Sequence, residues 1–307
     1  MSRRVGIVGL GVMGSAMARH LVDDGFDVIG FDIIADRVRE LADRGGRGAD
    51  SVADVAAHAD LVLLSLPSVG ALQQVAGELA SAATADGLLV LEMGTLPLAA
   101  KEEARRQLAD VGVELMDVPV SGTGIQAADA TLVIMASGSE EGYARALPVF
   151  EVIGSKSHHL GAFGTGSVMK YIANLLVAVH NLATAEAHAL GIAAGLDPAL
   201  VQKVMSDGVG ASKILDIRGP MMVDDEYRPP SARLEIILKD ARIIHDYAES
   251  LGAPTPLLDA VIPVYERSAA AGLGDLDAAA LCRHLEQTAG LVRSPPAGTG
   301  RNHPSPS

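Results

Sequence analysis

The sequence holds one cysteine, Cys282, among 307 residues and contains no tryptophan. A single thiol cannot form an internal disulfide and does not supply a zinc ligand set, so a disulfide scaffold and a structural zinc domain are excluded. Basic residues are also scarce, with 24 Lys and Arg against 38 Asp and Glu, giving a formal net charge of −14. Because nucleic-acid surfaces need clustered cations, we expect no nucleic-acid partner. A reducing, cytoplasmic compartment fits the lone thiol.

Long apolar runs are absent as well. No uncharged apolar stretch reaches the roughly 18 residues of a membrane span, so we expect no membrane partner. The N-terminus imitates a secretory signal peptide, because Arg3-Arg4 precedes an apolar stretch that ends in the small residues Ser15-Ala16-Met17-Ala18. Four glycines within the first fourteen residues would weaken such a helix, and we expect this stretch to belong to the fold.

What is present is an ordinary globular composition, with 49% hydrophobic and 20% charged residues. The length suits two domains of roughly 150 residues each. Short β-rich runs alternate with helical stretches up to about residue 160, which predicts a parallel sheet covered by helices. The expected strands are 5–8, 28–31, 61–66, 88–91, 113–116 and 132–135. A long helix over 166–194 and further helix-rich segments predict an all-helical second domain. The boundaries follow as 1–163, 164–292 and a disordered, proline-rich tail over 293–307.

A glycine-rich motif lies between the first expected strand and the first expected helix. It reads Gly9-Leu10-Gly11-Val12-Met13-Gly14, the GxGxxG pattern in which glycines allow a tight turn, close approach to a pyrophosphate and helix packing. Asp32 ends the next strand, 21 positions after Gly11, where a carboxylate can accept both ribose hydroxyls of an adenosine. The alternative is a glycine turn that only lets a helix pack closely. Strand, helix, second strand and acid together favour a dinucleotide site.

One lysine stands alone in the long apolar helix. Lys170 is the only charged residue between Lys156 and Glu186. At 100° per residue it shares a stripe with Asn174, Asn181 and His188. Burial would lower the pKa of such a lysine from about 10.4 towards neutrality, which suits proton exchange with a substrate hydroxyl. The other interpretation is a lysine whose stem covers apolar surface while its amine reaches water, and the residues alone leave both open.

Four motifs in order resemble the β-hydroxyacid dehydrogenases typified by 3-hydroxyisobutyrate dehydrogenase and tartronate semialdehyde reductase. Residues 9–18 are similar to the family's GLGxMGxxMA, and Asp117-Val118-Pro119-Val120-Ser121-Gly122 to its DxPVSG segment. The stretch from Gly164 through Lys170 to Asn174 resembles GxGxxxKxxxN, and Lys239-Asp240 resembles the KD pair. The likeness covers residues 4 to about 291.

The resemblance implies an α/β Rossmann dinucleotide-binding domain followed by an all-α domain, joined by a long interdomain helix, with the active site between them and a homodimer or homotetramer. It implies that Lys170 is the general acid/base and that Asn174 orients the substrate. Ser121, Gly122 and Thr123 would hold the substrate carboxylate through main-chain N–H groups and a hydroxyl. The cofactor would also meet Leu66, Pro67, Thr95 and Lys239.

Three of the last four have a plain alternative. Pro67 could only end a strand, Thr95 could cap a helix, and Lys239 could be a solvated helix residue. We expect no metal ligands among the site residues.

Departures from the family pattern concern the substrate side. Thr123 replaces a usual glycine, Gln126 stands where glycine is usual, and Ala173 and Gly94 replace a frequent Asn and Ser. A hydroxyl and an amide at 123 and 126 would stay unpaired against a purely methyl-substituted acid, at a cost of about 1–3 kcal/mol each. We therefore expect a 3-hydroxy acid or its semialdehyde with a further polar group, rather than 3-hydroxyisobutyrate.

Two rival functions share the fold. Imine reductases usually carry another residue at the catalytic lysine position, and non-catalytic dinucleotide-binding interaction modules usually lack that lysine too, so Lys170 favours a dehydrogenase. For the cofactor we expect NAD rather than NADP, because the Asp32 carboxylate would repel a 2′-phosphate and Ile33-Ile34 follow it instead of arginine. Arg37 is the one nearby cation that could reverse this preference.

Overall fold

The computed structural model describes residues 3–82 and 87–293, and the chain divides into two compact units, Met1–Ala173 and Asn174–Ser307. The division falls inside helix α8 (Thr165–Ala193). The predicted domain boundary at 163/164 lies just before Thr165, the first residue of this helix, and ten residues before the division at 173/174. Of the predicted tail, residues 294–307 lie outside the described residues.

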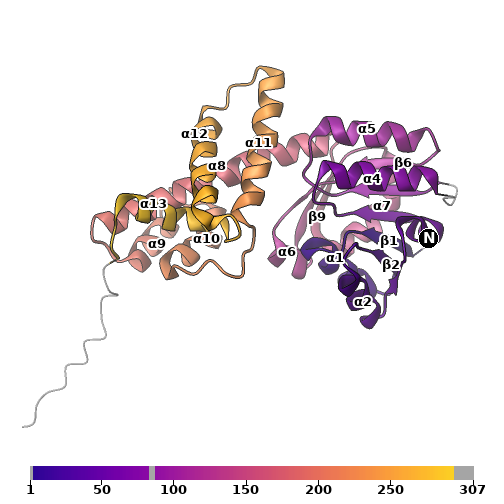
Figure 1. The fold of residues 1–307 in the computed structure, drawn as a ribbon, viewed down its shortest axis with the longest axis horizontal. Coiled ribbons are helices and arrows are strands. Elements are labelled where there is room, and N and C mark those ends of the chain that lie inside the picture. Colours follow the sequence, from indigo (N-terminus) through magenta and orange to yellow (C-terminus); the bar gives the residue numbers. More distant parts are fainter. Residues whose placement is uncertain (1–2, 83–86, 294–307) are drawn as a thin grey trace, which may run out of the picture. The chain divides into compact units, whose positions relative to one another are not determined.

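The first unit is built on a six-stranded parallel sheet in the order β3-β2-β1-β4-β5-β6, the order of dinucleotide-binding folds. Its strands are β1 (Arg4–Val8), β2 (Asp27–Phe31), β3 (Arg47–Gly48), β4 (Leu61–Leu64), β5 (Leu89–Glu92) and β6 (Glu114–Asp117). The stretch that imitates a signal peptide forms β1 and the helix after it. The predicted α/β class is thus confirmed (Figure 1).

One predicted strand belongs to a different sheet. Residues 132–135 lie in β8 (Leu132–Ala136), which pairs antiparallel with β7 (Val120–Ser121) and parallel with β9 (Gly154–His159). The sequence reading missed β9 because Gly-Ser-Lys-Ser-His-His has no apolar periodicity. β7 is too short to give a pattern.

The large sheet is buried on both faces, which is why its strands are continuous apolar runs. Side chains alternate along β4, so that Leu61 and Leu63 join a core with Met17, while Val62 and Leu64 join another with Leu72. Helices α1 and α7 cover the first face and α3, α4 and α5 the second, and α4 and α5 lie side by side (Figure 1). The helices of this unit are α1 (Val12–Asp23), α2 (Ala35–Asp43), α3 (Val52–His58), α4 (Val69–Ser81), α5 (Leu98–Ala109), α6 (Gly124–Ala128) and α7 (Glu140–Ile153).

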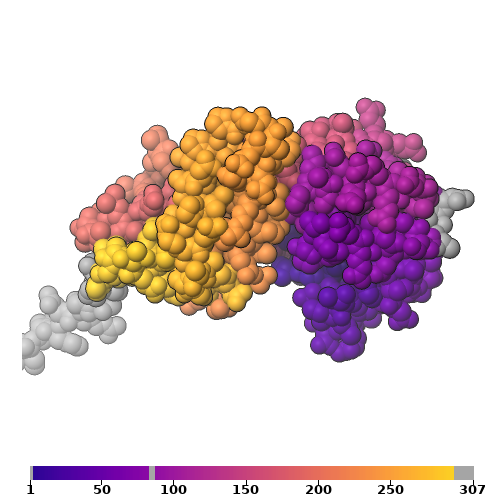
Figure 2. Space-filling view, turned by 45° about the horizontal axis from the view of Figure 1, so that its top comes forward, coloured from indigo at the N-terminus to yellow at the C-terminus, as the bar shows by residue number. Residues whose placement is uncertain are grey.

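The second unit is helical, as predicted, and its helices gather around the C-terminal part of α8 (Figure 1). In Figure 2 the orange surface of α11 and α12 forms the near face of this unit. A buried ion pair between Arg218 Nε and Asp277 Oδ1 (3.1 Å) ties two of its segments together. Its elements after α8 are α9 (Pro198–Asp207), α10 (Lys213–Asp224), α11 (Leu234–Leu251), α12 (Pro256–Ser268), the π-helical turn η1 (Ala269–Leu273), the 3₁₀ turn η2 (Ala278–Ala280) and α13 (Leu281–Ala289).

Helix α8 is the one helix of the described ranges that is long and apolar enough to cross a membrane by composition. Half of its most apolar window is buried inside the protein, and core helices of soluble proteins pass the same test.

Candidate active site

The three glycines of the turn after β1 meet different surroundings. Gly9 has a φ of +94°, and a Cβ there would lie 2.3 Å from the Ser65 carbonyl oxygen. At Gly14 a Cβ would lie 1.9 Å from the Gly9 carbonyl oxygen. A Cβ at Gly11, the N-cap of α1, would meet no atom within 4 Å. The fold itself therefore requires Gly9 and Gly14, whereas Gly11 leaves open space at a helix N-terminus, where an anion is favoured.

Asp32 follows β2 directly and is nearly buried, at 9% exposure. Its carboxylate accepts the N–H groups of Leu10 (2.7 Å) and Ile34 (2.8 Å). Arg37 Nη1 lies 3.2 Å from the same carboxylate. Because a carboxylate has about four lone-pair positions, acceptor capacity remains for ribose hydroxyls. Together with the open side of Gly11, these residues fit the adenosine and pyrophosphate parts of a nicotinamide dinucleotide. Leu10, Val12 and Met13 are the remaining residues of the GxGxxG motif, and α1 begins at Val12.

The other predicted cofactor segments reach the same edge of the sheet. Ser65 N–H donates to the carbonyl of Val8 (2.9 Å), which sets the segment after β4 beside the glycine turn. Leu66 is half-buried and Pro67 is exposed. β4 already ends at Leu64, so Pro67 is not its terminating residue.

Thr95 lies in the next loop, after β5, and is half-buried. The N-cap of α5 is Pro97, so Thr95 does not cap that helix. Four loops from the carboxyl ends of β1, β2, β4 and β5 thus form a row of predicted cofactor residues, as the fold places them in doubly wound proteins.

The substrate segment leads from β7 into α6. Gly122 has a φ of +144°, and a Cβ there would lie 2.7 Å from Leu132 Cδ2, so glycine is required. Ser121 is half-buried and Gly122 exposed.

The structure corrects the expectation of unpaired groups for Thr123 and for the side-chain oxygen of Gln126. Gln126 Oε1 accepts both the Thr123 N–H (2.8 Å) and the Thr123 hydroxyl (2.7 Å), forming a capping box at the start of α6. Both Thr123 donors that were predicted to hold the carboxylate are therefore satisfied within the protein. Within the described ranges, the Gln126 amide nitrogen makes no hydrogen bond.

The polar stripe of α8 is buried along its whole length, with exposures of 9% at Lys170, 8% at Asn174, 0% at Asn181 and 1% at His188. Lys170 belongs to the first unit and Asn174 to the second, one turn apart on one continuous helix. The C-terminal half of the stripe has structural partners. Asn181 Nδ2 donates to the Ala278 carbonyl (2.8 Å), and His188 Nε2 lies 2.9 Å from Gln202 Oε1.

Sequence reasoning named Lys239 but not the role of its neighbour Asp240. Asn174 Nδ2 donates to Asp240 Oδ2 (2.8 Å), and Lys239 Nζ lies 2.9 Å from Asp240 Oδ1. Asp240 is 5% exposed. It therefore fixes the amide plane of Asn174 and holds the Lys239 amine. The sequence signal that could have identified Asp240 was its place in the Lys239-Asp240 pair.

A fully buried charged cluster was also missed. Lys101 Nζ lies 2.5 Å from Glu92 Oε2 and 2.8 Å from Asp117 Oδ1, and all three side chains have 0% exposure. Burial raises the pKa of Glu92. Burial lowers the pKa of Lys101, but the two carboxylates outweigh that effect and leave it raised. The available signal was the spacing of Lys101 with the buried Ala104 and Leu108, which puts the lysine on the apolar face of α5.

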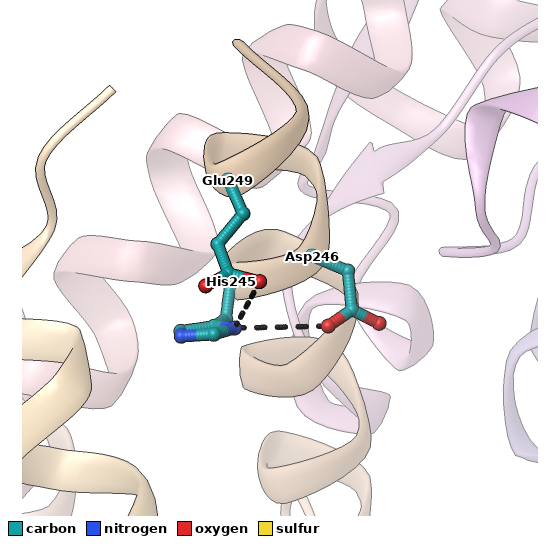
Figure 3. Close-up of side chains that lie close together, drawn as sticks. All are labelled: His245, Asp246 and Glu249. Carbon is teal, nitrogen blue, oxygen red and sulfur yellow. Dashed lines mark ion pairs between the residues drawn. The ribbon is translucent and has the colours of Figure 1, made fainter. Parts of the chain in front are cut away.

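One group of possible metal ligands lies on α11 (Figure 3). His245 Nδ1 lies 3.6 Å from Asp246 Oδ1 and 4.0 Å from Glu249 Oε2. Both carboxylates are mostly exposed, as in solvated surface ion pairs. We assign no ligand to this group.

Both parts of the chain match known dehydrogenase sequences. Residues 4–161 match the sequence profile of the NAD binding domain of 6-phosphogluconate dehydrogenase, and residues 164–285 match that described as NAD-binding of NADP-dependent 3-hydroxyisobutyrate dehydrogenase. The chain is 35% identical to L-threonate dehydrogenase of Cupriavidus necator over 286 residues, covering 92% of this chain and 96% of that one.

Solved structures give the same picture. A 3-hydroxyisobutyrate dehydrogenase from Salmonella typhimurium superposes with a TM-score of 0.83 at 30% identity, covering 92% of this chain and 99% of that one. A Streptomyces aurantiacus imine reductase has a TM-score of 0.62 at 20% identity, covering 92% and 99%, a likeness that extends to the fold alone. The chain belongs to the β-hydroxyacid dehydrogenase family of NAD(P)-dependent oxidoreductases.

Proposed function

We propose that this protein oxidises a small, polar 3-hydroxy acid with NAD, or reduces the corresponding semialdehyde, and that Lys170 is the general acid/base. The observation that carries the proposal is the attachment of the lysine-bearing helix to the substrate segment. Ser167 N–H, three residues before Lys170, donates to Asp117 Oδ2 (2.7 Å), and Asp117 begins the segment that leads to Ser121 and Gly122.

The proposed chemistry separates the two hydrogens of the alcohol. When bound, an oxidised nicotinamide supplies the acceptor for the hydride that leaves the carbinol carbon. Lys170 in its neutral form takes the hydroxyl proton, so that the C–O bond becomes a carbonyl and the amine becomes an ammonium. Asn174 orients the reacting hydroxyl, with its own amide fixed by Asp240. In the reducing direction Lys170 returns the proton.

The substrate carboxylate is proposed to bind the main-chain N–H groups around Ser121 and Gly122. Thr123 acts mainly by holding Gln126, whose Oε1 is fixed by two hydrogen bonds. The Gln126 amide nitrogen is then the donor that a substrate hydroxyl would satisfy. The likeness to an L-threonate dehydrogenase supports this, because L-threonate carries several hydroxyl groups on a short acid.

A panel of hydroxy acids tests the proposal. With NAD, we expect kcat/KM for L-threonate or a similar polyhydroxy acid to exceed that for 3-hydroxyisobutyrate at least tenfold. A tenfold ratio corresponds to a difference of about 1.4 kcal/mol in transition-state binding. Gln126→Leu is similar in size, removes the amide donor together with the oxygen that holds Thr123, and should reduce that ratio towards one. Equal efficiency on both acids in the wild type would contradict the polar-substrate proposal.

The choice of NAD over NADP rests on Asp32, whose carboxylate stands where a 2′-phosphate would meet negative charge. Arg37 is engaged with that carboxylate in an ion pair, which reduces its availability for a phosphate. Lys239 is proposed to lie near the reactive end of the cofactor.

We further propose that the protein lies in the cytoplasm and associates with copies of itself. Met169, Ile172 and Leu176 form an apolar stripe on α8 with exposures of 40%, 54% and 49%. Exposed apolar stripes of this kind mark contacts between proteins. A homodimer or homotetramer is expected, and light scattering coupled to size exclusion tests it.

A further inference from the structure

The buried cluster of Lys101, Glu92 and Asp117 also binds the backbone of the loop after β5. Glu92 Oε1 accepts the N–H of Gly94 (2.9 Å), and Lys101 Nζ donates to the Gly94 carbonyl (2.8 Å). Both polar groups of the Gly94 backbone are thus bound to the cluster. Gly94 immediately precedes Thr95, so the cluster fixes the loop after β5.

Asp117 extends the cluster to the start of α8. Its carboxylate accepts the N–H of Ser167 (2.7 Å) and the Ser167 hydroxyl (2.8 Å). Ser137 donates to Asp117 and accepts the N–H of Gly166 (3.0 Å). The first N–H groups of a helix have no partner within the helix, and here those of Gly166 and Ser167 are satisfied by the side chains of Ser137, which follows β8, and Asp117, which ends β6. The negative charge of Asp117 also stabilises the positive end of the helix dipole.

Such a cluster is a poor device for stability alone. Burying charged groups is costly, and apolar replacements of buried ion pairs are often neutral or stabilising. The cluster instead fixes the geometry of the segments that it joins, because each charged group accepts only one arrangement of its partners. The segments joined here carry Thr95, Ser121 and Lys170, three of the residues assigned to the reaction.

We propose that Glu92, Lys101, Asp117 and Ser167 are positioning residues of the active site, which fix the first turn of α8, and with it Lys170, against the loop after β5 and the substrate segment. The proposal rests on the role of Lys170 given above. The four side chains are buried, and they act through the residues that they hold in place.

One departure from the family pattern fits this arrangement. Where serine is frequent in the family, this chain has Gly94, and a Cβ there would lie 2.8 Å from Glu92 Oε1 and 3.3 Å from the Leu66 carbonyl oxygen. The Glu92 carboxylate thus occupies the space that a side chain at 94 needs.

Ser167→Ala tests the proposal, since it removes one hydrogen bond to Asp117 and leaves the main-chain bond in place. The matched control is Ser51→Ala, which removes the N-cap of α3 within the same unit, where Ser51 accepts the Asp54 N–H (3.1 Å). The measurements are kcat, the Kd for NADH, the melting temperature, and amide hydrogen exchange over residues 165–170 without cofactor.

We expect Ser167→Ala to lower kcat at least tenfold, because a displacement of about 1 Å can cost about 100-fold. Its Kd for NADH should stay within about twofold, and exchange in the first turn of α8 should accelerate. Ser51→Ala should lower the melting temperature by a similar amount and change neither kcat nor that exchange.

Glu92→Gln keeps the shape of the side chain and should also lower kcat, so the proposal remains testable if Ser167→Ala does not fold. Wild-type kcat and unchanged exchange in either variant would overturn it. Because Lys170→Ala tests the catalytic role separately, an inactive Lys170→Ala beside a fully active Ser167→Ala would refute only the positioning proposal.

Discussion

Gly11 and Gly14 are three residues apart in one turn, yet a methyl group added at each has opposite expected effects. At Gly14 the new carbon would lie 1.9 Å from the Gly9 carbonyl oxygen, far short of ordinary van der Waals contact. Backbone cannot yield as a side chain can, so the turn after β1 has to shift. At Gly11 the new carbon meets nothing within 4 Å, and the φ of −70° suits alanine.

The expected magnitudes follow from these contacts. Gly14→Ala should destabilise the first unit by about 3 kcal/mol, the upper range for overpacked sites. For a unit of this size that lowers the melting temperature by about 6–12 °C. Gly11→Ala should leave the melting temperature within about 2 °C, since surface changes stay within about 0.5 kcal/mol. Its methyl group instead enters the space reserved for the pyrophosphate and should raise the Kd for NADH at least tenfold.

Thermal unfolding without cofactor and calorimetric titration with NADH separate the two effects. The reasoning fails if Gly11→Ala binds NADH as the wild type does, because the open side of Gly11 would then not face the cofactor. It fails equally if Gly14→Ala is as stable as the wild type.

Two further predictions concern charged groups. Arg37→Ala should raise the ratio of kcat/KM for NAD over NADP severalfold, because it removes the cation that could meet a 2′-phosphate beside Asp32; an unchanged ratio in paired assays would exclude Arg37 from cofactor choice. Burial lowers the pKa of His188 although its hydrogen bond to Gln202 opposes the shift, so the native state binds this proton less readily than the unfolded chain. Stability should therefore fall as pH drops below about 6.5 towards the lowered pKa, by up to about 1.4 kcal/mol per pH unit. Denaturant unfolding at several pH values should show the full effect in the wild type and in His58→Gln, and a smaller one in His188→Gln, where His284, whose pKa burial also lowers, remains.

Much of the fold was predictable because its signals are local. The apolar runs of the large sheet and the GxGxxG turn each lie within a few consecutive residues. Strand β9 was not predictable from periodicity, since Ser155 to His159 are polar or charged and acquire strand geometry only by pairing with β8.

The candidate site also contains residues that local sequence predicts and residues that only the fold brings together. Gly9 to Gly14 and Asp32 could be named from spacing, whereas the bonds of Asp117 to Lys101 and Ser167 join residues 16 and 50 positions apart. Only the fold brings these side chains together. The pairing of Thr123 with Gln126 was readable from sequence as a capping box, Thr-x-x-Gln, and was instead interpreted as a pair of substrate donors.

The central claim is that Lys170 exchanges the substrate proton while other residues hold the dinucleotide. Single-turnover hydride transfer and NADH affinity should be measured together in Lys170→Ala, Lys170→Arg and Lys156→Ala, the last replacing an exposed lysine of β9 as the control. We expect hydride transfer to fall by about 100-fold or more in both Lys170 variants, because the general base is lost or, in arginine, cannot release its proton. The Kd for NADH should stay within about threefold, and Lys156→Ala should behave as the wild type. Retention of more than about a tenth of the wild-type rate by Lys170→Ala would contradict the account.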